Sequence, residues 1–531
     1  MTALVGTRAL VRLALRRDRI LLPAWIVVFV GMAASSASAS FDLYPTVRSR
    51  VLAAGSFNGT QSLVALYGRI YDPTSLGGIA MIKMGGIGAV FVAVLAILIV
   101  VRHTRAEEEA GRLELVGATV VGRYAPLTAA LLVALGMSLA LAALTAVGLT
   151  AAGLPADGSF AFGFAWAGVG IAFAAIASVT GQLTRSARAA TGIASAVLGF
   201  VYVLRAIGDT AGRTGPGWLT WLSPIGWGQQ FRPYAGNRWW VLLITVGFSI
   251  VVAAGAYALL GRRDLGAGLV PDRPGPATAA PTLRSPLALA WRLQRGGLLG
   301  WAAAFALLGL VFGNIASSVG DFVSTPQMRE FITKLGGEEG LVDAYIRVCL
   351  SVIGLAASAY GVQAAMRLRS EETGLRAEPI LATAAGRVGW ASSHISIAIL
   401  GTTLLIVVAG AGAGLAHGAQ IGDMGAGFGV LGGALVQVPA ACVLTGIVVA
   451  AFGLAPRLVA AGWVALVGFV LLGELGPLFE LDQWVMDVSP FTHVPEIPGA
   501  GLIVTPLVAL TAVAALLIAV GLIGFRRRDV G

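Results

Sequence analysis

Acidic and basic side chains recur in the same pattern at two places in a largely apolar chain. Residues 105–123 have the sequence RAEEEAGRLELVGATVVGR, and residues 369–387 have the sequence RSEETGLRAEPILATAAGR. Carboxylates and guanidinium groups at matched positions form ion pairs, either inside each segment or with complementary charges on another protein. The repeated pattern therefore predicts a pair of protein-docking elements. The identical positions are Arg105/Arg369, Glu107/Glu371, Glu108/Glu372, Arg112/Arg376, Glu114/Glu378, Ala118/Ala382, Thr119/Thr383, Gly122/Gly386 and Arg123/Arg387.

Each repeated segment is expected to contain a short helix. Glu108 precedes Arg112 by four residues, as Glu372 precedes Arg376, which is the favourable order for a helical ion pair worth about 0.3–0.5 kcal/mol. Pro379 is expected to end the second helix sooner. The alternative is a helical loop stabilised only by its own charges, which would not explain why identity is concentrated in these segments.

Catalytic and nucleotide-binding motifs are missing from the sequence. The lysines, Lys83 and Lys334, do not follow a glycine, so the chain contains no GxxxxGK[ST] phosphate-binding loop. The sequence also contains no HExxH motif, no GxSxG in a plausible triad context and no series of carboxylates spaced as a proton relay. The four histidines are isolated, and Cys349 and Cys442 lie in apolar runs. We therefore expect neither an enzyme nor a bound cofactor or metal.

The composition places these charged segments in a membrane protein. Apolar residues make up 57% of the chain and charged residues 12%, with a mean hydropathy of +0.85. Runs of about 20 apolar residues, each long enough to cross a bilayer as a helix, recur from end to end. They predict an all-α polytopic protein with twelve transmembrane helices, near residues 20–40, 79–101, 125–148, 159–184, 189–207, 239–260, 296–317, 342–366, 390–416, 426–454, 457–475 and 502–525.

The distribution of basic residues predicts the orientation of the chain. With the N-terminus inside, the cytoplasmic segments contain most of the 36 Lys and Arg residues, so we expect both termini in the cytoplasm. The basic residues lie around the ends of the spans instead of along one stripe, which argues against nucleic-acid binding despite the net charge of +10. Residues 1–40 resemble a signal peptide only superficially, because cleavage would remove the first span.

The two halves of the chain repeat one unit of six spans. Arg16, Arg19 and Trp25 before and within the first span match Arg292, Arg295 and Trp301 at the seventh. A Ser-Pro pair near the end of each half (Ser223-Pro224 and Ser489-Pro490) and an Arg-Arg-Asp after each last span (Arg262 to Asp264 and Arg527 to Asp529) also recur. An even number of spans makes the repeats parallel. We expect halves at 1–260 and 287–531, a Pro- and Gly-rich cytoplasmic linker at 261–286, and a working cavity between the halves.

A basic helix is expected before the first span. Arg8, Arg12, Arg16 and Arg19 are spaced by four, four and three residues, which places them along one stripe of a helix lying on the inner leaflet. Anionic headgroups would attract each of them by about 1 kcal/mol. An ordinary positively charged flank of the first span is an equally good explanation. Arg292 and Arg295 form a weaker counterpart before the seventh span.

The six spans per half, the basic helix and the EExGRxExxxATxxGR-like segment after the second span resemble the permeases of ABC-2-type, or type V, ABC exporters. Within that group, the fused twelve-span organisation and residues 105–123 resemble the actinobacterial permeases of tetronasin-resistance or multidrug exporters. The resemblance implies a bacterial plasma-membrane protein whose two repeated segments are coupling helices and whose basic helix is an elbow helix. It also implies two copies of a separate ATPase subunit, which bind ATP and Mg²⁺, and a hydrophobic or amphipathic cargo.

Two other classes of protein remain as alternatives. A secondary transporter of the major-facilitator kind also has two parallel six-span halves, but the basic GxxxDRxGRR-like loop after its second span is missing here. A membrane enzyme acting on lipid-linked substrates would require paired carboxylates facing one surface, and the sequence shows none.

Overall fold

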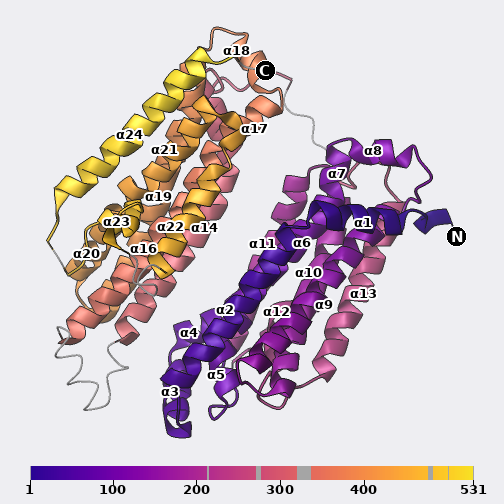
Figure 1. The fold of residues 1–531 in the computed structure, drawn as a ribbon, viewed down its shortest axis with the longest axis vertical. Coiled ribbons are helices and arrows are strands. Elements are labelled where there is room, and N and C mark those ends of the chain that lie inside the picture. The colour runs from indigo at the N-terminus through magenta and orange to yellow at the C-terminus, as the bar shows by residue number, and fades with distance from the viewer. Residues whose placement is uncertain are drawn as a thin grey trace. The chain divides into compact units, whose positions relative to one another are not determined.

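The protein is built from helices, as the apolar runs predict, and divides into two compact units. The computed structural model describes residues 2–211, 215–270, 277–319, 337–475, 482–499 and 501–529, and these contain helices and connecting loops but no strand. The units are Met1–Gly275 and Pro276–Gly531, so their boundary falls within the predicted linker at 261–286, of which residues 271–276 lie outside the described part (Figure 1).

Among the described residues of the first unit, six helical stretches are long and apolar enough to cross a membrane. The second of them is a continuous helical stretch in which a π-helical turn, η2, joins α5 to α6. They are α2 (Leu21–Leu43), α5 (Leu76–Lys83) with η2 (Met84–Gly88) and α6 (Ala89–His103), α9 (Ala125–Ala151), α10 (Ala156–Leu183), α11 (Ala187–Thr210) and α13 (Trp240–Gly261).

Helix α10 forms the centre of the first unit. It packs against α6, α9 and α13, and it buries the large side chains of Trp166 and Phe173. Small residues permit this close packing, because a Cβ atom on Gly163 would overlap the backbone carbonyl of Ala142 in α9. The abundance of glycine in this apolar chain is therefore explained in part by helix contacts inside the unit.

Among the described residues of the second unit, five helical stretches meet the same criteria of length and apolarity. They are α14 (Pro286–Val319), α16 (Gly337–Ala365), α19 (Arg387–Ile421), the pair α20 (Met424–Leu435) and α21 (Val438–Leu454), and α24 (Val504–Arg527). The span predicted at 457–475 corresponds to α22 (Ala461–Leu475), whose 15 residues rise only about 22 Å as an α-helix. The structure thus shows eleven candidate spans among the described residues, and the number twelve remains a prediction.

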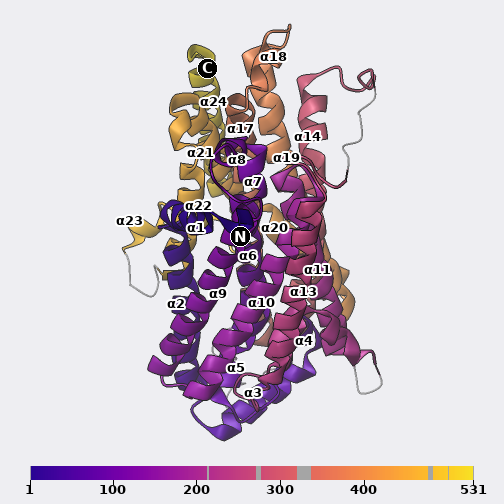
Figure 2. The same cartoon turned by 90° about the vertical axis from the view of Figure 1, so that its right-hand side faces the viewer.

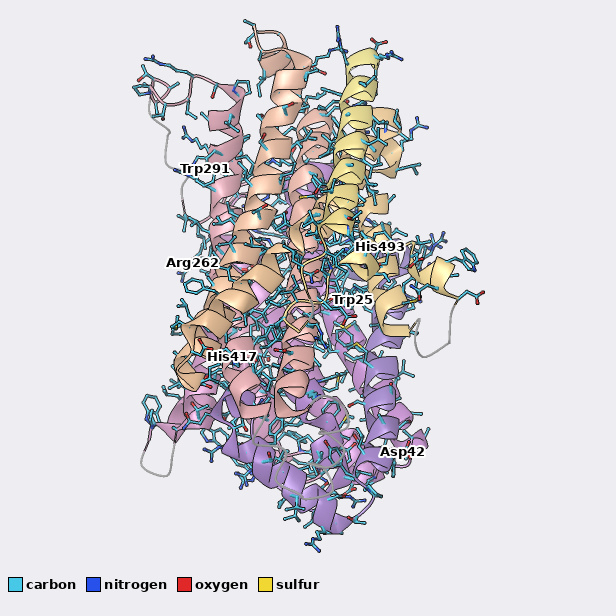
Figure 3. All side chains as sticks on the ribbon, turned by 90° about the vertical axis from the view of Figure 1, so that its left-hand side faces the viewer. Trp25, Asp42, Arg262, Trp291, His417 and His493 are labelled. Atoms are coloured by element: carbon cyan, nitrogen blue, oxygen red, sulfur yellow. The ribbon has the colours of Figure 1, made fainter. Side chains whose placement is uncertain are left out.

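Large apolar side chains cover the outside of the helices. Val27 in α2 is 69% exposed, Leu243 in α13 is 74% exposed and Val464 in α22 is 72% exposed, and Figure 3 shows side chains projecting along the helices. Exposed apolar surface of this extent along long helices is the surface that lipid tails cover. The protein is therefore an all-α, multi-pass membrane protein.

Shorter helices lie at the two ends of the first unit. At one end, α1 (Thr7–Arg17) crosses the ends of the long helices next to the loop between α6 and α9 (Figures 1 and 2). At the other end, the long connection between α2 and α5 folds into α3 (Val47–Gly59) and α4 (Gln61–Tyr67). According to the predicted orientation, the end with α1 is the cytoplasmic end.

Candidate functional site

The first repeated segment contains two short helices instead of one. Helix α7 (Arg105–Glu109) continues from α6, the chain turns at Gly111, and α8 (Arg112–Gly117) follows. Gly111 has a φ of 70°, a left-handed conformation that glycine adopts without strain. This turn separates Glu108 from Arg112, so the predicted ion pair between them is wrong. Arg112 instead contacts Glu107, and Glu108 points into the unit.

Glu108 lies at the centre of a buried cluster of charges that joins the segment to the end of the last span. Its carboxylate accepts hydrogen bonds from Arg105 at 2.6 Å and from both terminal nitrogens of Arg263 at 2.6 and 2.8 Å. The backbone N–H of Gly266 donates a further bond at 2.6 Å. All three charged side chains are buried, and the Arg263 Nε donates to Gln182 at 2.8 Å. The cluster therefore attaches α7 to the chain immediately after α13.

The second half contains the same cluster. Helix α17 (Arg367–Thr373) carries Glu372, which pairs with Arg369 at 2.8 Å and with Arg528 at 2.8 Å. Arg263 and Arg528 occupy matching positions in the two Arg-Arg-Asp sequences that follow the last span of each half. The predicted pair between Glu372 and Arg376 is likewise wrong. Both halves instead use the second glutamate of the segment to bind an arginine after their final span.

The first glutamate of the shared pair binds arginines nearer the surface. Glu107 accepts two hydrogen bonds from Arg112, both at 2.8 Å, and one from Arg17 of α1 at 2.6 Å. The hydrogen bond with Glu107 raises the pKa of the Arg112 guanidinium. Glu107 therefore connects the repeated segment to the basic helix.

In the second half, Glu371 occupies the position that corresponds to Glu107. It pairs with Arg376 at 2.9 Å and with Arg367 at 2.6 Å. Arg367 precedes Glu371 by four residues in α17, so this copy is held by its own helix, whereas Glu107 is held in part by α1.

Two further repeated residues stabilise the ends of helices. Arg123 donates to the backbone carbonyls of Leu260 at 2.8 Å and of Arg263 at 2.7 Å, and Arg387 donates to the carbonyl of Arg528 at 2.7 Å. Cationic side chains at these C-terminal carbonyls satisfy acceptors that have no partner within the helix.

The repeated threonines act locally. Thr119 donates to the carbonyl of Val116, and Thr383 to the carbonyl of Ile380, both at 2.6 Å. Hydrogen bonds within each unit therefore explain why these threonines, and the arginines Arg123 and Arg387, recur in both halves. None of the four side chains has to lie at a docking surface to account for the repeat.

The exposed part of the first segment is α8 and the loop after it. Glu114 lies in the first turn of α8, Leu115 is 75% exposed and Val120 is 86% exposed. Apolar side chains this exposed, outside the spans and beside an acidic group, are a candidate contact surface for another protein. Of the residues predicted for docking, Glu114 is the one that fits this role best, and the buried Glu108 does not.

The second segment also has an exposed outer part, formed by α18, but a different residue lies at its turn. Its turn falls at Leu375, with a φ of 54°, at the position that matches Gly111. Helix α18 (Ala377–Leu381) contains Pro379 within its first turn, where proline is tolerated, so the expectation that Pro379 ends the helix is wrong. Glu378 and Pro379 are exposed, as Glu114 is in the first segment.

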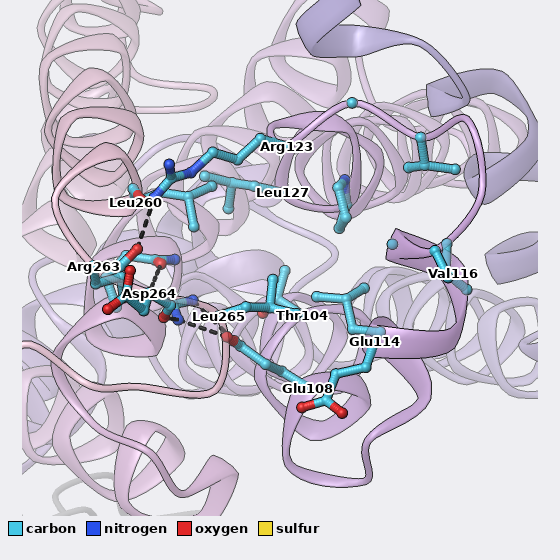
Figure 4. Close-up of a pocket in the computed structure, with 17 residues that line it drawn as sticks. Thr104, Glu108, Glu114, Val116, Arg123, Leu127, Leu260, Arg263, Asp264 and Leu265 are labelled. Atoms are coloured by element: carbon cyan, nitrogen blue, oxygen red, sulfur yellow. Dashed lines mark hydrogen bonds and ion pairs between the residues drawn. The ribbon is translucent and has the colours of Figure 1, made fainter.

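A cavity of about 610 Å³ lies behind α8 in the first unit. Its walls are formed by α8, the loop 118–123, the start of α9 and the end of α13, and Figure 4 shows Glu114 and Val116 on one side and Leu260 and Arg263 on the other. Because α8 does not pack closely on the spans behind it, it has room to move as a unit about Gly111. The Glu108 cluster at the edge of the cavity would remain in place during such a movement.

The predicted basic helix is present as α1. Arg8, Arg12 and Arg16 lie exposed in α1, Arg19 follows its end, and together with Val11 and Leu15 they border a shallow groove. Their contact with anionic lipid remains a prediction. In the second half, Arg292 and Arg295 lie in the first part of α14, which continues unbroken into the span, so the structure gives them no separate helix.

The break between α1 and α2 occurs at a buried acid that sequence reasoning missed. Asp18 is fully buried and lies 2.5 Å from the His103 Nε2 and 3.1 Å from Arg102, at the end of α6. This contact joins the end of α1 to the end of α6, and the pair of Arg17 and Glu107 joins α1 to the repeated segment. The corresponding residue in the second half is Gln294, which contacts His394. The sequence did contain a signal for this contact, because Asp18 is an acidic residue within a stretch of arginines.

Comparison with known proteins places this arrangement in a family. The family described as the C-terminal domain of the multidrug efflux system permease Rv1217c matches residues 8–260 and 283–526. The chain belongs to this permease family. It is also 44% identical over 528 residues to the multidrug efflux system permease protein Rv1217c of Mycobacterium tuberculosis (strain ATCC 25618 / H37Rv), a match that covers 99% of this chain and 95% of the relative. The two matched ranges of the permease each include one repeated segment and one final span.

Among the described residues of the permease, no group of three or more His, Cys, Asp or Glu side chains is arranged to hold a metal. Its charged residues instead gather at the ends of the spans in pairs. The sequence identified the repeated glutamates and arginines of each segment, and it also showed the repeated Arg-Arg-Asp. It missed that these two repeats contact each other, although their joint recurrence in both halves was a signal of that contact.

Proposed function

We propose that this permease is the transmembrane subunit of an ATP-driven exporter of hydrophobic or amphipathic compounds, coupled to separately encoded ATPase subunits. The main support is that each half fixes the base of its repeated segment by buried charges and leaves a short helix, α8 or α18, exposed at the tip. A loop with only a connecting role would not require such a base twice. The permease name of the relative is consistent with this proposal.

In the proposed mechanism, ATP and Mg²⁺ are bound by two copies of the ATPase. One copy contacts the acidic and apolar surface around Glu114 and Leu115, and the other contacts the surface around Glu378. Movement of the ATPases would shift α8 about Gly111 into the cavity behind it, towards the end of α13, while the Glu108 cluster keeps the base of the segment in place. The proposal also places both termini and both repeated segments in the cytoplasm.

The test uses the exposed residues and leaves the buried charges unchanged. A tagged permease is purified gently from its native membranes with bound proteins, and the complex is reconstituted in liposomes. We expect an ATPase of separate sequence in the preparation, ATP-dependent accumulation of a fluorescent amphipathic dye, and no hydrolysis by the permease alone. Dye transport that requires a proton or sodium gradient without ATP would instead indicate a secondary transporter and contradict the proposal.

Substitutions then locate the contact. Glu114→Arg with Leu115→Asp should reduce ATPase recovery at least tenfold while leaving membrane insertion intact, because like charges and an apolar-to-charged change would face the partner. Glu378→Arg should act in the same direction in the second half. Arg48→Glu is the control, because Arg48 is exposed in α3 at the opposite end of the first unit. Unchanged recovery with both tip variants would show that the segments do not dock an ATPase.

A further inference from the structure

An apolar groove opens on the outside of the first unit, in the corner between α1, α2 and α9. The groove has a volume of about 300 Å³, at the lower end of the range of roughly 300–1,000 Å³ for small-molecule sites. Its floor contains the buried side chains of Val133 and Met137, whereas Leu15 and Leu132 on its rim are 48% and 47% exposed. A ligand can therefore enter this groove sideways from the surrounding lipid.

The corner exists because the chain bends between the basic helix and the first span. A turn at Asp18, which is buried against His103, separates α1 from α2. Helix α1 consequently crosses the ends of the long helices, and the groove lies where it meets α2 and α9 (Figure 1). In the described part of the second half, α14 runs unbroken from its basic residues into the span, so the corresponding corner is not formed there.

The apolar groove adjoins the shallow groove along α1 that is bordered by the four arginines of the basic stretch. Val11, Leu15 and Arg19 line both grooves. Positive charge therefore lies directly beside an apolar hollow, with Arg19 at the junction. A molecule with an anionic head and an apolar tail matches this combination, since the head would meet the arginines and the tail would leave water.

The positive charge beside the groove is not compensated within the described residues. The side chains of Arg8, Arg12, Arg16 and Arg19 are exposed and form no ion pair with a described acidic residue, whereas the neighbouring Arg17 pairs with Glu107. Asp18 also lines the apolar groove, but its carboxylate is engaged by His103 and Arg102. The anion that fits this surface must therefore come from outside the chain.

We infer that the two grooves together bind one anionic phospholipid of the adjoining leaflet, with its phosphate on Arg16 and Arg19 and one acyl chain in the apolar groove. The chain would follow α9 from Leu132 to Ala140, a stretch that rises about 12 Å along the helix. This is a discrete site for one lipid molecule, in contrast to the general attraction between a basic helix and a charged membrane surface.

A lipid at this site would hold α1 against the ends of α2 and α9. Because Arg17 of α1 pairs with Glu107, the same lipid would also support the base of the first repeated segment. The inference goes beyond the coupling proposal, since binding of the lipid requires no ATPase.

The test uses the full chain in nanodiscs of phosphatidylcholine that contain a photoreactive lipid. Two probes carry the same diazirine-bearing acyl chain, one on a phosphatidylglycerol headgroup and the other on a phosphatidylcholine headgroup. After illumination, mass spectrometry measures labelling of residues 22–26 and 132–140 as the mole fraction of probe is raised. We expect saturable labelling by the phosphatidylglycerol probe, half-maximal at a mole fraction at least fivefold lower than for the phosphatidylcholine probe. Labelling that does not saturate, or that is equal with both probes, would overturn the inference.

Arginine variants test the headgroup contact. Arg16→Gln with Arg19→Gln should remove the preference for phosphatidylglycerol, because both residues border the basic groove. Arg188→Gln with Arg262→Gln is the matched control, since both of these arginines are exposed in the first unit and line neither groove. The control should keep the preference within twofold of the wild type. An equal loss in both double variants would mean that the lipid responds only to net charge, and it would contradict the site.

A glycine variant tests the position of the acyl chain while every arginine is kept. Gly136 lines the groove on α9 and has no atom within 4 Å of its Cβ position, so a leucine there projects into open space in the groove. Gly136→Leu should reduce labelling of residues 22–26 by the phosphatidylglycerol probe at least fivefold. Gly247→Leu, at an equally open and exposed position in α13, should label as the wild type does. Unchanged labelling in Gly136→Leu would overturn the inference and leave only general attraction of headgroups to α1.

Discussion

Glu107 and Glu108 are neighbours in the sequence, yet they have different surroundings. Glu108 lies in a buried cluster with Arg105 and Arg263, whereas Glu107 pairs with Arg17 and Arg112 nearer the surface. Removing one member of a buried cluster leaves uncompensated charges in the interior, which costs about 3–5 kcal/mol. A more exposed pair contributes about 0–1 kcal/mol. Loss of Glu108 should therefore destabilise the folded protein more than loss of Glu107.

We expect Glu108→Ala to lower the thermal stability of the purified permease far more than Glu107→Ala. The measurement is the temperature at which half of the protein is lost from the monodisperse peak in size-exclusion chromatography. Glu372→Ala tests the repeat, because Glu372 occupies the equivalent buried cluster and should behave as Glu108→Ala does. Equal effects of Glu107→Ala and Glu108→Ala would show that the buried cluster does not stabilise the fold.

At the scale of elements, the two segments turn at matching positions with different residues. Gly111 and Leu375 both adopt a positive φ between their two short helices. A Cβ on Gly111 would meet no atom within 4 Å, so a substitution there changes the backbone energy and not the packing. We expect Gly111→Ala to destabilise the segment by roughly 1 kcal/mol and Leu375→Gly to relieve strain in the other.

Hydrogen exchange of the two segments measures this difference. Amides of α8 should exchange faster in Gly111→Ala, and amides of α18 should exchange more slowly in Leu375→Gly. Gly117→Ala is the matched control in the first segment, because Gly117 also has no atom near its Cβ position but has a helical backbone. Faster exchange of α18 in Leu375→Gly would mean that the left-handed turn is not the source of strain.

The basic helix α1 supports a separate prediction about charge. Replacing Arg8, Arg12, Arg16 and Arg19 together with Gln should reduce contact of α1 with liposomes containing anionic lipid, whereas replacement with Lys should preserve it, because headgroups respond to the charge. The depth of a spin label at Leu13, which is half exposed in α1, provides the measurement. If the Gln and Lys variants give the same depth, headgroup attraction does not position this helix.

The sequence predicted the elements of the permease better than their contacts. Runs of apolar residues predicted the eleven candidate spans of the described residues, most of them to within a few residues of the helix ends, because a bilayer requires a minimum length of apolar helix. The partner of Glu108 could not be found by the same local reasoning, since Arg263 lies 155 residues away and the i,i+4 rule favoured Arg112. The turn at Gly111 removed that local pair, and only the fold brings the distant arginine close.

At the scale of the whole molecule, each unit contains its own buried charge cluster. Glu108 and Arg263 both lie within Met1–Gly275, and Glu372 and Arg528 both lie within Pro276–Gly531. The stabilising contacts between each repeated segment and its final span therefore do not require the other half. This arrangement suits a chain in which one unit was repeated.

Division of the chain between Gly275 and Pro276 should consequently leave two fragments that insert and fold. We expect both fragments, expressed together, to be protected from protease at the sites that are protected in the intact chain. The control fragment ends at residue 261, which removes Arg263 and should expose the segment 105–123 to cleavage. Rapid degradation of residues 1–275 with Arg263 present would show that the first unit depends on the second.

The long separation between Glu108 and Arg263 also has a consequence for synthesis on the ribosome. Arg263 is synthesised 155 residues after Glu108, which takes roughly 8 to 30 seconds at ordinary rates of elongation. During that interval the loop after the second span carries an acidic group paired only with its near neighbour Arg105. Completion of the last span in each half thus acts as the step that closes the nascent unit, and a pause in translation before Arg263 would prolong the period in which proteases of the membrane can recognise it.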